Sequence, residues 1–372
     1  MRIGIPKETR DGETRVAATP ETTKKLVAAG HQVLIEREAG QKARFPDQAY
    51  ADMGAELVDT QTALAADTVL KVRAPSGDEL KHMQSGSVLV GMLDPFDDAG
   101  LATLAQAGLT AFALEAAPRT TRAQSLDVLS SQANLAGYKA VMLAANAYGR
   151  LFPMMMTAAG TLKAARVVVL GAGVAGLQAI ATAKRLGAVV EASDVRPAAK
   201  EQVESLGAKF IDVPYETEEE REIAEGVGGY ARPMPKAWMD RQAERVAERC
   251  KQADIVITTA LIPGRAAPEL VSASTVNAMK PGSVIVDLAV ERGGNCPLSV
   301  AGQTIDHNGV VIIGQTNLPG MVATDASALY ARNLFDFLKL IVDAEGKLAV
   351  NREDDIVKAC LMCEAGQVLR KN

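Results

Sequence analysis

The sequence predicts an α/β protein with two domains, each built on a doubly wound, mainly parallel sheet. Its 372 residues, 48% of them hydrophobic, are enough to bury two cores of ordinary size. Short apolar runs alternate with helical patterns along most of the chain, as they do in consecutive βαβ units. One long helical pattern, over residues 125–149, separates two series of such runs and is expected to bridge the domains.

The first domain is expected to be discontinuous. Thr19, Pro20 and Gly30 occupy the N-cap, first-turn and C′ positions that mark a complete helix. Near the C-terminus, a long amphipathic pattern indicates a helix that returns to this domain, so its expected bounds are 1–128 plus 318–372. Apolar runs typical of parallel strands buried on both faces lie at 2–5, 32–36, 69–72, 87–91 and 109–114.

The second domain, 129–317, contains a dinucleotide-binding signature. A strand pattern, the turn Gly171-x-Gly173-x-x-Gly176, a helix and a strand ending at Asp194 follow one another. The glycines permit, in order, a tight turn, close approach of a pyrophosphate, and close packing of helix on strand. The helix start then points unpaired N–H groups at the phosphates. Further strands are expected at 208–213, 254–260, 282–289 and 309–314, and both domains are expected to be Rossmann-like or flavodoxin-like.

Asp194 predicts a preference for NAD(H) over NADP(H), because its carboxylate can accept both ribose hydroxyls and repel a 2′-phosphate. Arg196 argues the other way, since an arginine there can hold a 2′-phosphate or stack on adenine. We expect the acid to dominate. The segment 258–264, TTALIPG, ends a strand where the nicotinamide would lie.

Composition excludes several functions. The net charge of −5 and the scattered Lys and Arg residues provide no basic field for nucleic acid. The absence of an apolar signal region and of any eighteen-residue apolar run predicts a cytoplasmic chain that does not span a membrane. Cys360 and Cys363 form C-x-x-C without a second ligand pair or a thioredoxin-like setting, and only three histidines occur, so no metal site is expected.

Two polar segments need an explanation. Residues 214–235 combine an acidic run, expected to be a solvated helix face, with a glycine-tyrosine sequence and two prolines, as in a lid. Residues 118–140, PRTTRAQSLDVLSSQANLAGYKA, are rich in hydroxyl, amide and arginine side chains but offer no usual proton-transfer group. Taken alone, this second segment can be a capped hinge helix.

The chain resembles the NAD(H)-binding component, domain I, of the proton-translocating nicotinamide nucleotide transhydrogenases over essentially its whole length. The stretches that carry the resemblance include IPKETRDGETRVAATPE, PRTTRAQSLDVLSSQANLAGYKA, FPMMMTAAGT, GAGVAGLQAIATAKRLGA, DLAVERGGNCPLS and TNLPGMVATDASALYARNLFDF. Alanine dehydrogenase is the sister family, with a similar two-domain plan.

The resemblance implies a role for the polar stretch. Arg119, Gln124 and Asp127 correspond to a loop that lies over the nicotinamide, and Ser130 corresponds to a contact of its carboxamide. Hydride transfer between two nicotinamides needs alignment of the rings rather than a general acid. The resemblance also assigns cofactor contacts to Val174 and Ala175 at the phosphates, Asp194, Val195 and Arg196 at the adenosine, Gly229 and Tyr230 on the lid, Gln242 on the next helix, and Ala260 and Leu261 beside the nicotinamide.

The resemblance further implies partners. The family continues into an NADP(H)-binding domain and a membrane domain, and this chain contains neither, so we expect a separate NAD(H)-binding subunit of a bacterial enzyme. Its partners would carry NADP(H) and span the inner membrane, and would hold this chain at the cytoplasmic face. A homodimer with its nucleotide domains in contact is also expected, although the methionines of FPMMM could equally belong to the core of a monomer.

An NAD-dependent alanine dehydrogenase remains the main alternative, and a nucleotide sensor without turnover is a weaker one. In alanine dehydrogenases an arginine and a lysine hold pyruvate and a histidine handles the proton. Arg15 and Lys71 match the first two, but Asp94 stands where the histidine would be. An aspartate with an ordinary pKa is a poorly matched acid at neutral pH. Arg15 and Lys71 can also be solvated or inter-domain charges.

Overall fold

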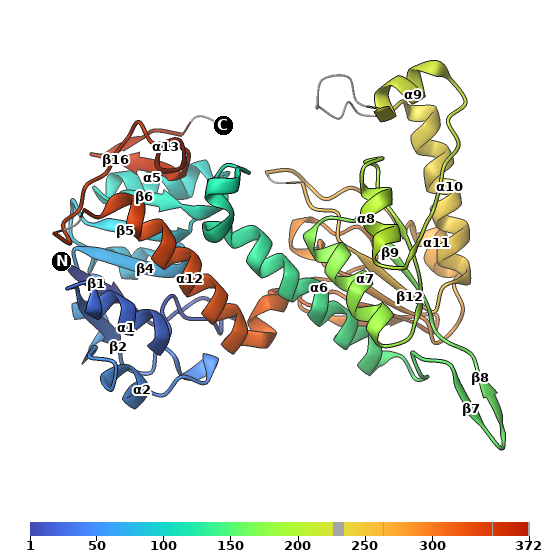
Figure 1. Ribbon diagram of the computed structural model, residues 1–372, viewed down its shortest axis with the longest axis horizontal. Helices are drawn as coiled ribbons and strands as arrows, with labels where there is room; N and C mark the ends of the chain where they lie inside the picture. The colour runs from blue at the N-terminus through green and yellow to red at the C-terminus, as the bar shows by residue number, and fades with distance from the viewer. Residues whose placement is uncertain (226–233, 263, 344, 371–372) are drawn as a thin grey trace. The chain divides into compact units, whose positions relative to one another are not determined.

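The computed structural model describes residues 1–225, 234–262, 264–343 and 345–370, and the chain divides into two compact units (Figure 1). Unit 1 comprises Met1–Gln132 and Pro319–Asn372, and unit 2 comprises Ala133–Leu318. The division falls within helix α6 (Val128–Ala147), where the sequence predicts a long helix. Within the described ranges, no helix is long and apolar enough to cross a bilayer.

Unit 1 contains one large sheet with helices packed against it. Its strands are β1 (Arg2–Ile5), β2 (Gln32–Glu36), β3 (Glu56–Val58), β4 (Thr68–Arg73), β5 (Val88–Met92), β6 (Thr110–Ala113), β16 (Leu361–Glu364) and β17 (Gln367–Val368). Its helices are α1 (Pro20–Ala28), α2 (Asp47–Ala51), α3 (Thr60–Leu64), α4 (Gly77–Leu80), α5 (Asp98–Gln106), α12 (Ala323–Ile341) and α13 (Asp355–Cys360), with 3₁₀ turns η1 (Gln41–Ala43), η2 (Leu114–Ala116), η3 (Thr121–Leu126) and η5 (Leu318–Val322), the last of which begins at the end of unit 2.

The sheet of unit 1 has the order β17-β16-β6-β5-β4-β1-β2-β3. β1 to β6 pair in parallel, which confirms the mainly parallel sheet predicted from the apolar runs. β16 is antiparallel to β6, and β17 to β16. The sequence analysis did not predict these two strands, because the short run Leu361–Glu364 follows α13 directly, without a turn signal between them.

The C-terminal segment completes the core of unit 1 (Figure 1). Tyr330, Leu334 and Phe337 on α12 are fully buried in the same cluster as Ile3 and Ile5 on β1. The prediction that this helix returns to the amino-terminal sheet is therefore confirmed.

The cysteines of the C-x-x-C sequence are part of the same packing. Cys360 and Cys363 are buried, and burial raises the pKa of their thiols to about 12 and about 11. Thiols with raised pKa values are poor nucleophiles at neutral pH, so neither has the properties of a reactive cysteine.

Unit 2 is built on a second sheet. Its strands are β7 (Met155–Thr157), β8 (Gly160–Leu162), β9 (Arg166–Leu170), β10 (Val189–Ser193), β11 (Lys209–Phe210), β12 (Ile255–Thr258), β13 (Val284–Asp287), β14 (Thr304–His307) and β15 (Val310–Ile313). Its helices, besides most of α6, are α7 (Val174–Arg185), α8 (Ala199–Ser205), α9 (Glu218–Glu225), α10 (Lys236–Gln252) and α11 (Ala273–Asn277), with the 3₁₀ turn η4 (Val290–Arg292).

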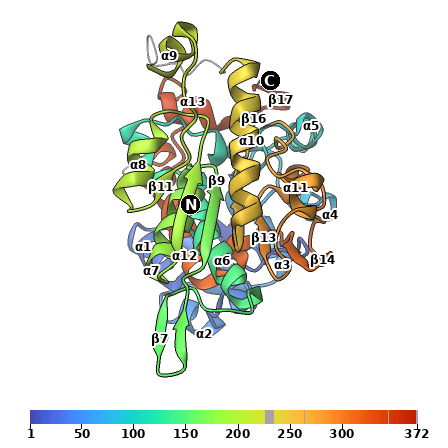
Figure 2. The same cartoon turned by 90° about the vertical axis from the view of Figure 1, so that its right-hand side faces the viewer.

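The main sheet of unit 2 has the order β11-β10-β9-β12-β13-β15-β14 and is parallel except for β14. Alternate residues of β9 face two cores: Val167 and Val169 pack in the cluster of α7, and Val168 and Leu170 in the cluster of α10. Figure 2 shows α8 and α10 on opposite sides of the strands. The strand order reverses between β9 and β12, and ligands of such sheets bind at the carboxyl ends of the strands at this point.

Candidate functional site

The turn at residues 171–176, called the glycine turn below, has the predicted geometry. Gly171 follows β9 with a φ of +98°, and Gly176 packs so tightly that an added Cβ would lie 1.8 Å from the carbonyl oxygen of Gly171. An added Cβ at Gly173, in contrast, would meet no atom within 4 Å. Gly173 is also the N-cap of α7 and provides no side chain to accept the N–H groups at the helix start. The turn therefore leaves open space and unpaired donors, as an anion site requires.

Asp194 lies beside this turn and binds its backbone. Its Oδ2 accepts the N–H of Ala172 at 2.7 Å. Arg196 donates to the same carboxylate from its backbone N at 2.8 Å and from Nε and Nη2 at 3.0 Å each. Burial opposes ionisation, but these bonds outweigh it and lower the pKa of Asp194. The carboxylate is thus held ionised, with its oxygens occupied by protein donors.

Two other predicted contact regions lie at the same edge of the sheet. Gln242 on α10 is buried and donates from Nε2 to the carbonyl oxygen of Asp194 at 3.2 Å. Ala260 and Leu261 follow β12, and Leu261 is 50% exposed. The hydroxyl of Thr259 donates to the carbonyl oxygen of Gly171 at 3.0 Å, which ties this segment to the glycine turn. Sequence analysis missed Thr259, although it stands inside the TTALIPG segment.

Gly229 and Tyr230, expected on a lid, lie outside the described residues. The acidic run before them forms α9, whose glutamates at 218 and 219 are exposed, as predicted for a solvated helix face. Among the described residues, no group of His, Cys, Asp and Glu side chains is arranged to hold a metal ion.

Residues 119–130, called the polar loop below, present side chains outward from unit 1. Ala123 and Leu126 of η3 are buried, whereas Arg119 and Gln124 are exposed. Asp127 follows η3 and accepts both the N–H of Ser130, at 2.9 Å, and its hydroxyl, at 2.6 Å. Because the Ser130 hydroxyl proton is used in this way, its oxygen remains available only as an acceptor.

Side chains from the C-terminal segment hold the polar loop, and sequence analysis did not identify them. Asn333 on α12 donates from Nδ2 to the carbonyl oxygen of Ser125 at 2.8 Å and accepts the hydroxyl of Ser131 at 2.8 Å. Arg122 donates to both carboxylate oxygens of Asp354, at 2.6 and 2.9 Å, and also contacts Asp355. The contacts link residues more than 200 positions apart, so no local sequence pattern could reveal them.

Arg15 and Lys71 are buried and paired with carboxylates inside unit 1. Arg15 donates to Glu13 from Nε at 2.8 Å and from Nη2 at 2.7 Å. Lys71 donates to Glu79 at 2.7 Å and lies 3.5 Å from Glu8. Burial alone would raise the pKa of Glu13, but its bonds to Arg15 and the nearby charges lower it to about 2. The interpretation of these two cations as solvated charges is therefore wrong, because each is neutralised in the core.

Asp94 has an unexpected acidic neighbour. Its backbone, with a φ of +54°, donates an N–H to Glu115 at 3.0 Å. Burial, with a smaller contribution from the charge of Asp94, raises the pKa of Glu115 to about 7 against the effect of its backbone hydrogen bonds. A carboxyl group that titrates near neutrality therefore lies beside the residue that replaces the dehydrogenase histidine.

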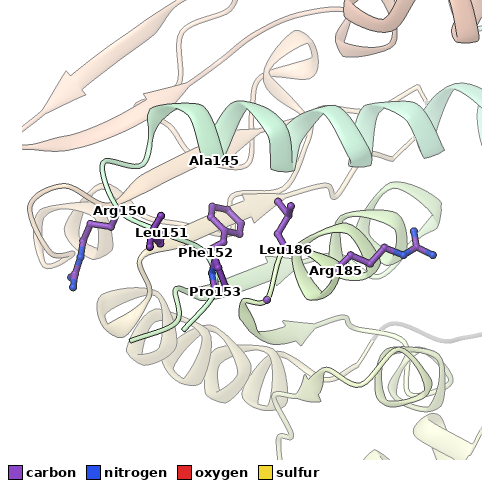
Figure 3. A pocket seen from close by; sticks show the side chains of 8 residues that line it. Ala145, Arg150, Leu151, Phe152, Pro153, Arg185 and Leu186 are labelled. Carbon is purple, nitrogen blue, oxygen red and sulfur yellow. The ribbon is translucent and has the colours of Figure 1, made fainter. Parts of the chain in front are cut away.

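A hollow of about 560 Å³ lies at the other end of α7 (Figure 3). Arg150, Leu151, Phe152 and Pro153 line it together with Leu186. Since α7 has 12 residues and each rises about 1.5 Å, the hollow is roughly a helix length from the glycine turn. It is therefore not part of the candidate nucleotide site.

Comparison with known proteins gives consistent matches. The family models described as "Alanine dehydrogenase/PNT, N-terminal domain" and "Alanine dehydrogenase/PNT, C-terminal domain" match residues 4–136 and 140–371. The chain is 50% identical to the first of the separate NAD(P) transhydrogenase subunit alpha chains of Rhodospirillum rubrum, over 99% of this chain and 98% of that protein. It is 27% identical to alanine dehydrogenase 1 of Staphylococcus aureus, over 99% and 94% of the two chains.

Solved structures give the same ranking. A transhydrogenase from Sinorhizobium meliloti matches with a TM-score of 0.90 at 50% identity, covering 99% of this chain and 100% of that one. An L-alanine dehydrogenase matches with a TM-score of 0.82 at 29% identity, covering 99% and 97%. These matches confirm the predicted fold class.

Proposed function

The chain belongs to the alanine dehydrogenase/PNT family, and we propose that it is the NAD(H)-binding component of a proton-translocating transhydrogenase. It would pass hydride directly between NADH bound here and NADP⁺ bound on a partner component. The higher identity to transhydrogenase alpha subunits than to alanine dehydrogenases supports this choice.

The pairing of Arg15 and Lys71 is the observation that carries the choice between the two activities. A keto acid bound as in alanine dehydrogenase would have to displace buried carboxylates from both cations. Separating a buried pair is costly, because it leaves an uncompensated charge. Hydride transfer between two nicotinamides makes no demand on either cation, since its reactants supply both carbon centres.

The glycine turn would hold the pyrophosphate of NAD(H). Gly171, Gly173 and Gly176 shape the turn, and the N–H groups of Val174 and Ala175 at the start of α7 would face the phosphates. The other proposed contacts are Asp194, Val195 and Arg196 at the adenosine, Gln242 behind them, Ala260 and Leu261 at the nicotinamide, and Gly229 and Tyr230 on a lid. For Asp194 to bind the ribose hydroxyls, the Arg196 guanidinium would have to move from its carboxylate.

The polar loop would align the nicotinamide. We assign Arg119, Gln124, Asp127 and Ser130 to this task. Ser130 would accept a hydrogen bond from the carboxamide NH₂ group, because its own proton is donated to Asp127. Gln124 can donate and accept at once, which suits a group shared between NADH and the ribose of the partner's nucleotide.

The proposed assembly has two kinds of partner. An NADP(H)-binding subunit and a membrane-spanning subunit would complete the enzyme and hold this chain at the cytoplasmic face of the inner membrane. A homodimer is also proposed, supported by the exposure of Met154, Met155 and Met156, 42% or more, on and beside the hairpin of β7 and β8. Sedimentation at micromolar concentration should give about twice the chain mass of 39.1 kDa.

The direct test is reconstitution. This chain, mixed with a separately prepared NADP-binding component, should reduce an NADP⁺ analogue with NADH, and neither component should do so alone. The alternative activity is favoured by one observation, the near-neutral pKa of Glu115 beside Asp94. Oxidation of NADH with pyruvate and ammonium by this chain alone would establish alanine dehydrogenase activity and refute the proposal.

A further inference from the structure

We propose that Asn295 is a positioning residue for the nicotinamide: held by Asp287, it fixes the backbone of Ala260 and thereby the wall against which the ring is placed. This inference rests on the proposed function and adds a residue to it. The residues concerned all lie in unit 2.

The wall itself has little support from regular structure. β12 ends at Thr258, and the residues after it belong to no helix or strand. Leu261 and Ile262 are 50% and 46% exposed at the carboxyl edge of the sheet, where the strand order reverses. Exposed apolar side chains at such an edge suit a flat ring, but their position depends on how the preceding backbone is held.

The side chain of Asn295 holds that backbone from below. It is fully buried, and its Oδ1 accepts the N–H of Ala260 at 3.0 Å. Its Nδ2 donates to the carbonyl oxygen of Ala260 at 2.9 Å and to that of Pro268 at 2.7 Å. One amide thus satisfies both backbone groups of Ala260 and uses both of its own N–H donors.

Asp287 at the end of β13 fixes Asn295 in turn. This carboxylate is fully buried and accepts the backbone N–H of Asn295 at 3.2 Å. It also accepts the N–H groups of Ala289 and Cys296 and the hydroxyls of Thr258 and Ser299, at 2.7–3.1 Å. Gly294 allows this arrangement, since an added Cβ would lie 2.7 Å from Oδ2 of Asp287. Hydrogen bonds of this number hold a buried carboxylate in one orientation.

The result is a segment fixed on two sides. Thr259 is tied to the carbonyl oxygen of Gly171 in the glycine turn, and Ala260 is tied to Asn295. The distance between the proposed pyrophosphate site and the nicotinamide wall is therefore set by hydrogen bonds rather than by strand pairing. A ring displaced by about 1 Å can react on the order of a hundredfold more slowly, while the rest of the dinucleotide still binds.

The test separates alignment from binding. Asn295→Asp keeps the shape but replaces both N–H donors with an acceptor that faces two carbonyl oxygens. Asn295→Ala removes the contacts without adding charge, and serves if the aspartate variant fails to fold. Exposed Asn277 on α11, changed to Asp, is the matched control. For folded variants at Asn295, NADH affinity should stay within about threefold of the parent, whereas single-turnover transfer to partner-bound nucleotide at saturating NADH should fall at least about tenfold.

Two results would overturn the inference. Transfer as fast as in the parent would show that Asn295 does not align the ring. A loss confined to NADH affinity, with normal transfer once NADH saturates, would show a structural role only. Failure of the proposed function is distinguishable, because the parent chain itself would then transfer no hydride to the partner.

Discussion

The glycine turn of unit 2 and the polar loop of unit 1 are both proposed to contact one dinucleotide, but they are held in different ways. The turn is fixed by its own backbone, through a positive φ at Gly171 and the contact of Gly176 with a carbonyl five residues earlier. The loop is fixed by side chains of Asn333 and Asp354, far along the chain. A backbone site is therefore written in a short stretch of sequence, whereas a side-chain site depends on the completed fold.

The largest effect is expected from a pair of changes within the glycine turn. Gly176→Ala should destabilise unit 2 by about 3 kcal/mol and abolish NADH binding, because the new Cβ would collide with the backbone at Gly171. Gly173→Ala should fold like the parent, since its Cβ meets open space, yet bind NADH about tenfold more weakly, a difference of about 1.4 kcal/mol. Thermal unfolding and NADH titration of both variants provide the check. Parent-like NADH binding by Gly176→Ala would remove the turn from the site.

The one carboxylate beside the turn should have the next largest effect. Asp194→Ala should weaken NADH at least about tenfold, as hydrogen bonds to charged groups contribute about 1.5–3 kcal/mol. The change also frees Arg196, so the ratio of NADPH to NADH affinity should rise. Asp194→Asn, which can still accept the N–H of Ala172, controls for damage to the turn. Unchanged NADH affinity in the alanine variant would show that Asp194 does not bind the ribose.

The anchor of the polar loop can be tested without changing the loop. Asn333→Ala removes the contacts to Ser125 and Ser131. Hydride transfer should fall about tenfold while NADH affinity changes little, because misplacement affects the reaction more than binding. Arg332→Ala, an exposed neighbour on α12 that pairs with Glu21, should behave like the parent. Equal transfer rates in all three proteins would mean that the loop needs no support from α12.

The smallest effect is expected at the exposed ion pair of the loop. Asp354→Asn can still cap α13 but loses its charge pairing with Arg122, and should lower the melting temperature by only about 1–2 °C at neutral pH. The bond to Arg122 lowers the pKa of Asp354 from 3.8 to about 2 in the folded protein. The stabilisation is therefore complete above pH 3.8 and is lost as the pH falls towards 2. Melting temperatures of the two proteins should converge over that range, and a constant difference would contradict the assignment.

The sequence predicted most of the fold and the local part of the site. Apolar runs located the parallel strands, because strands buried on both faces leave little choice of residue. The glycine turn was predicted because each glycine answers a separate steric need. In contrast, the strand Leu361–Glu364 was missed, since its place at the edge of β6 is decided by tertiary pairing.

Side-chain partnerships were the part that sequence reasoning could not supply. Asp194 and Arg196 were identified, but not that they bind each other in the structure. The pairing of Lys71 with Glu79 and the burial of Asn295 beneath Ala260 likewise join residues whose spacing follows no pattern. Such contacts depend on how elements pack, which local propensity does not determine.

The central claim, that the polar loop aligns two nicotinamides rather than retaining one, is tested most directly at Gln124. Gln124→Asn keeps the amide but shortens its reach, and the parent side chain is exposed, so the fold should not change. Stopped-flow transfer from NADH to partner-bound nucleotide should slow at least about tenfold, with NADH affinity, measured separately, within about threefold of the parent. An unchanged transfer rate would contradict the account and leave residues 118–140 as a capped hinge helix.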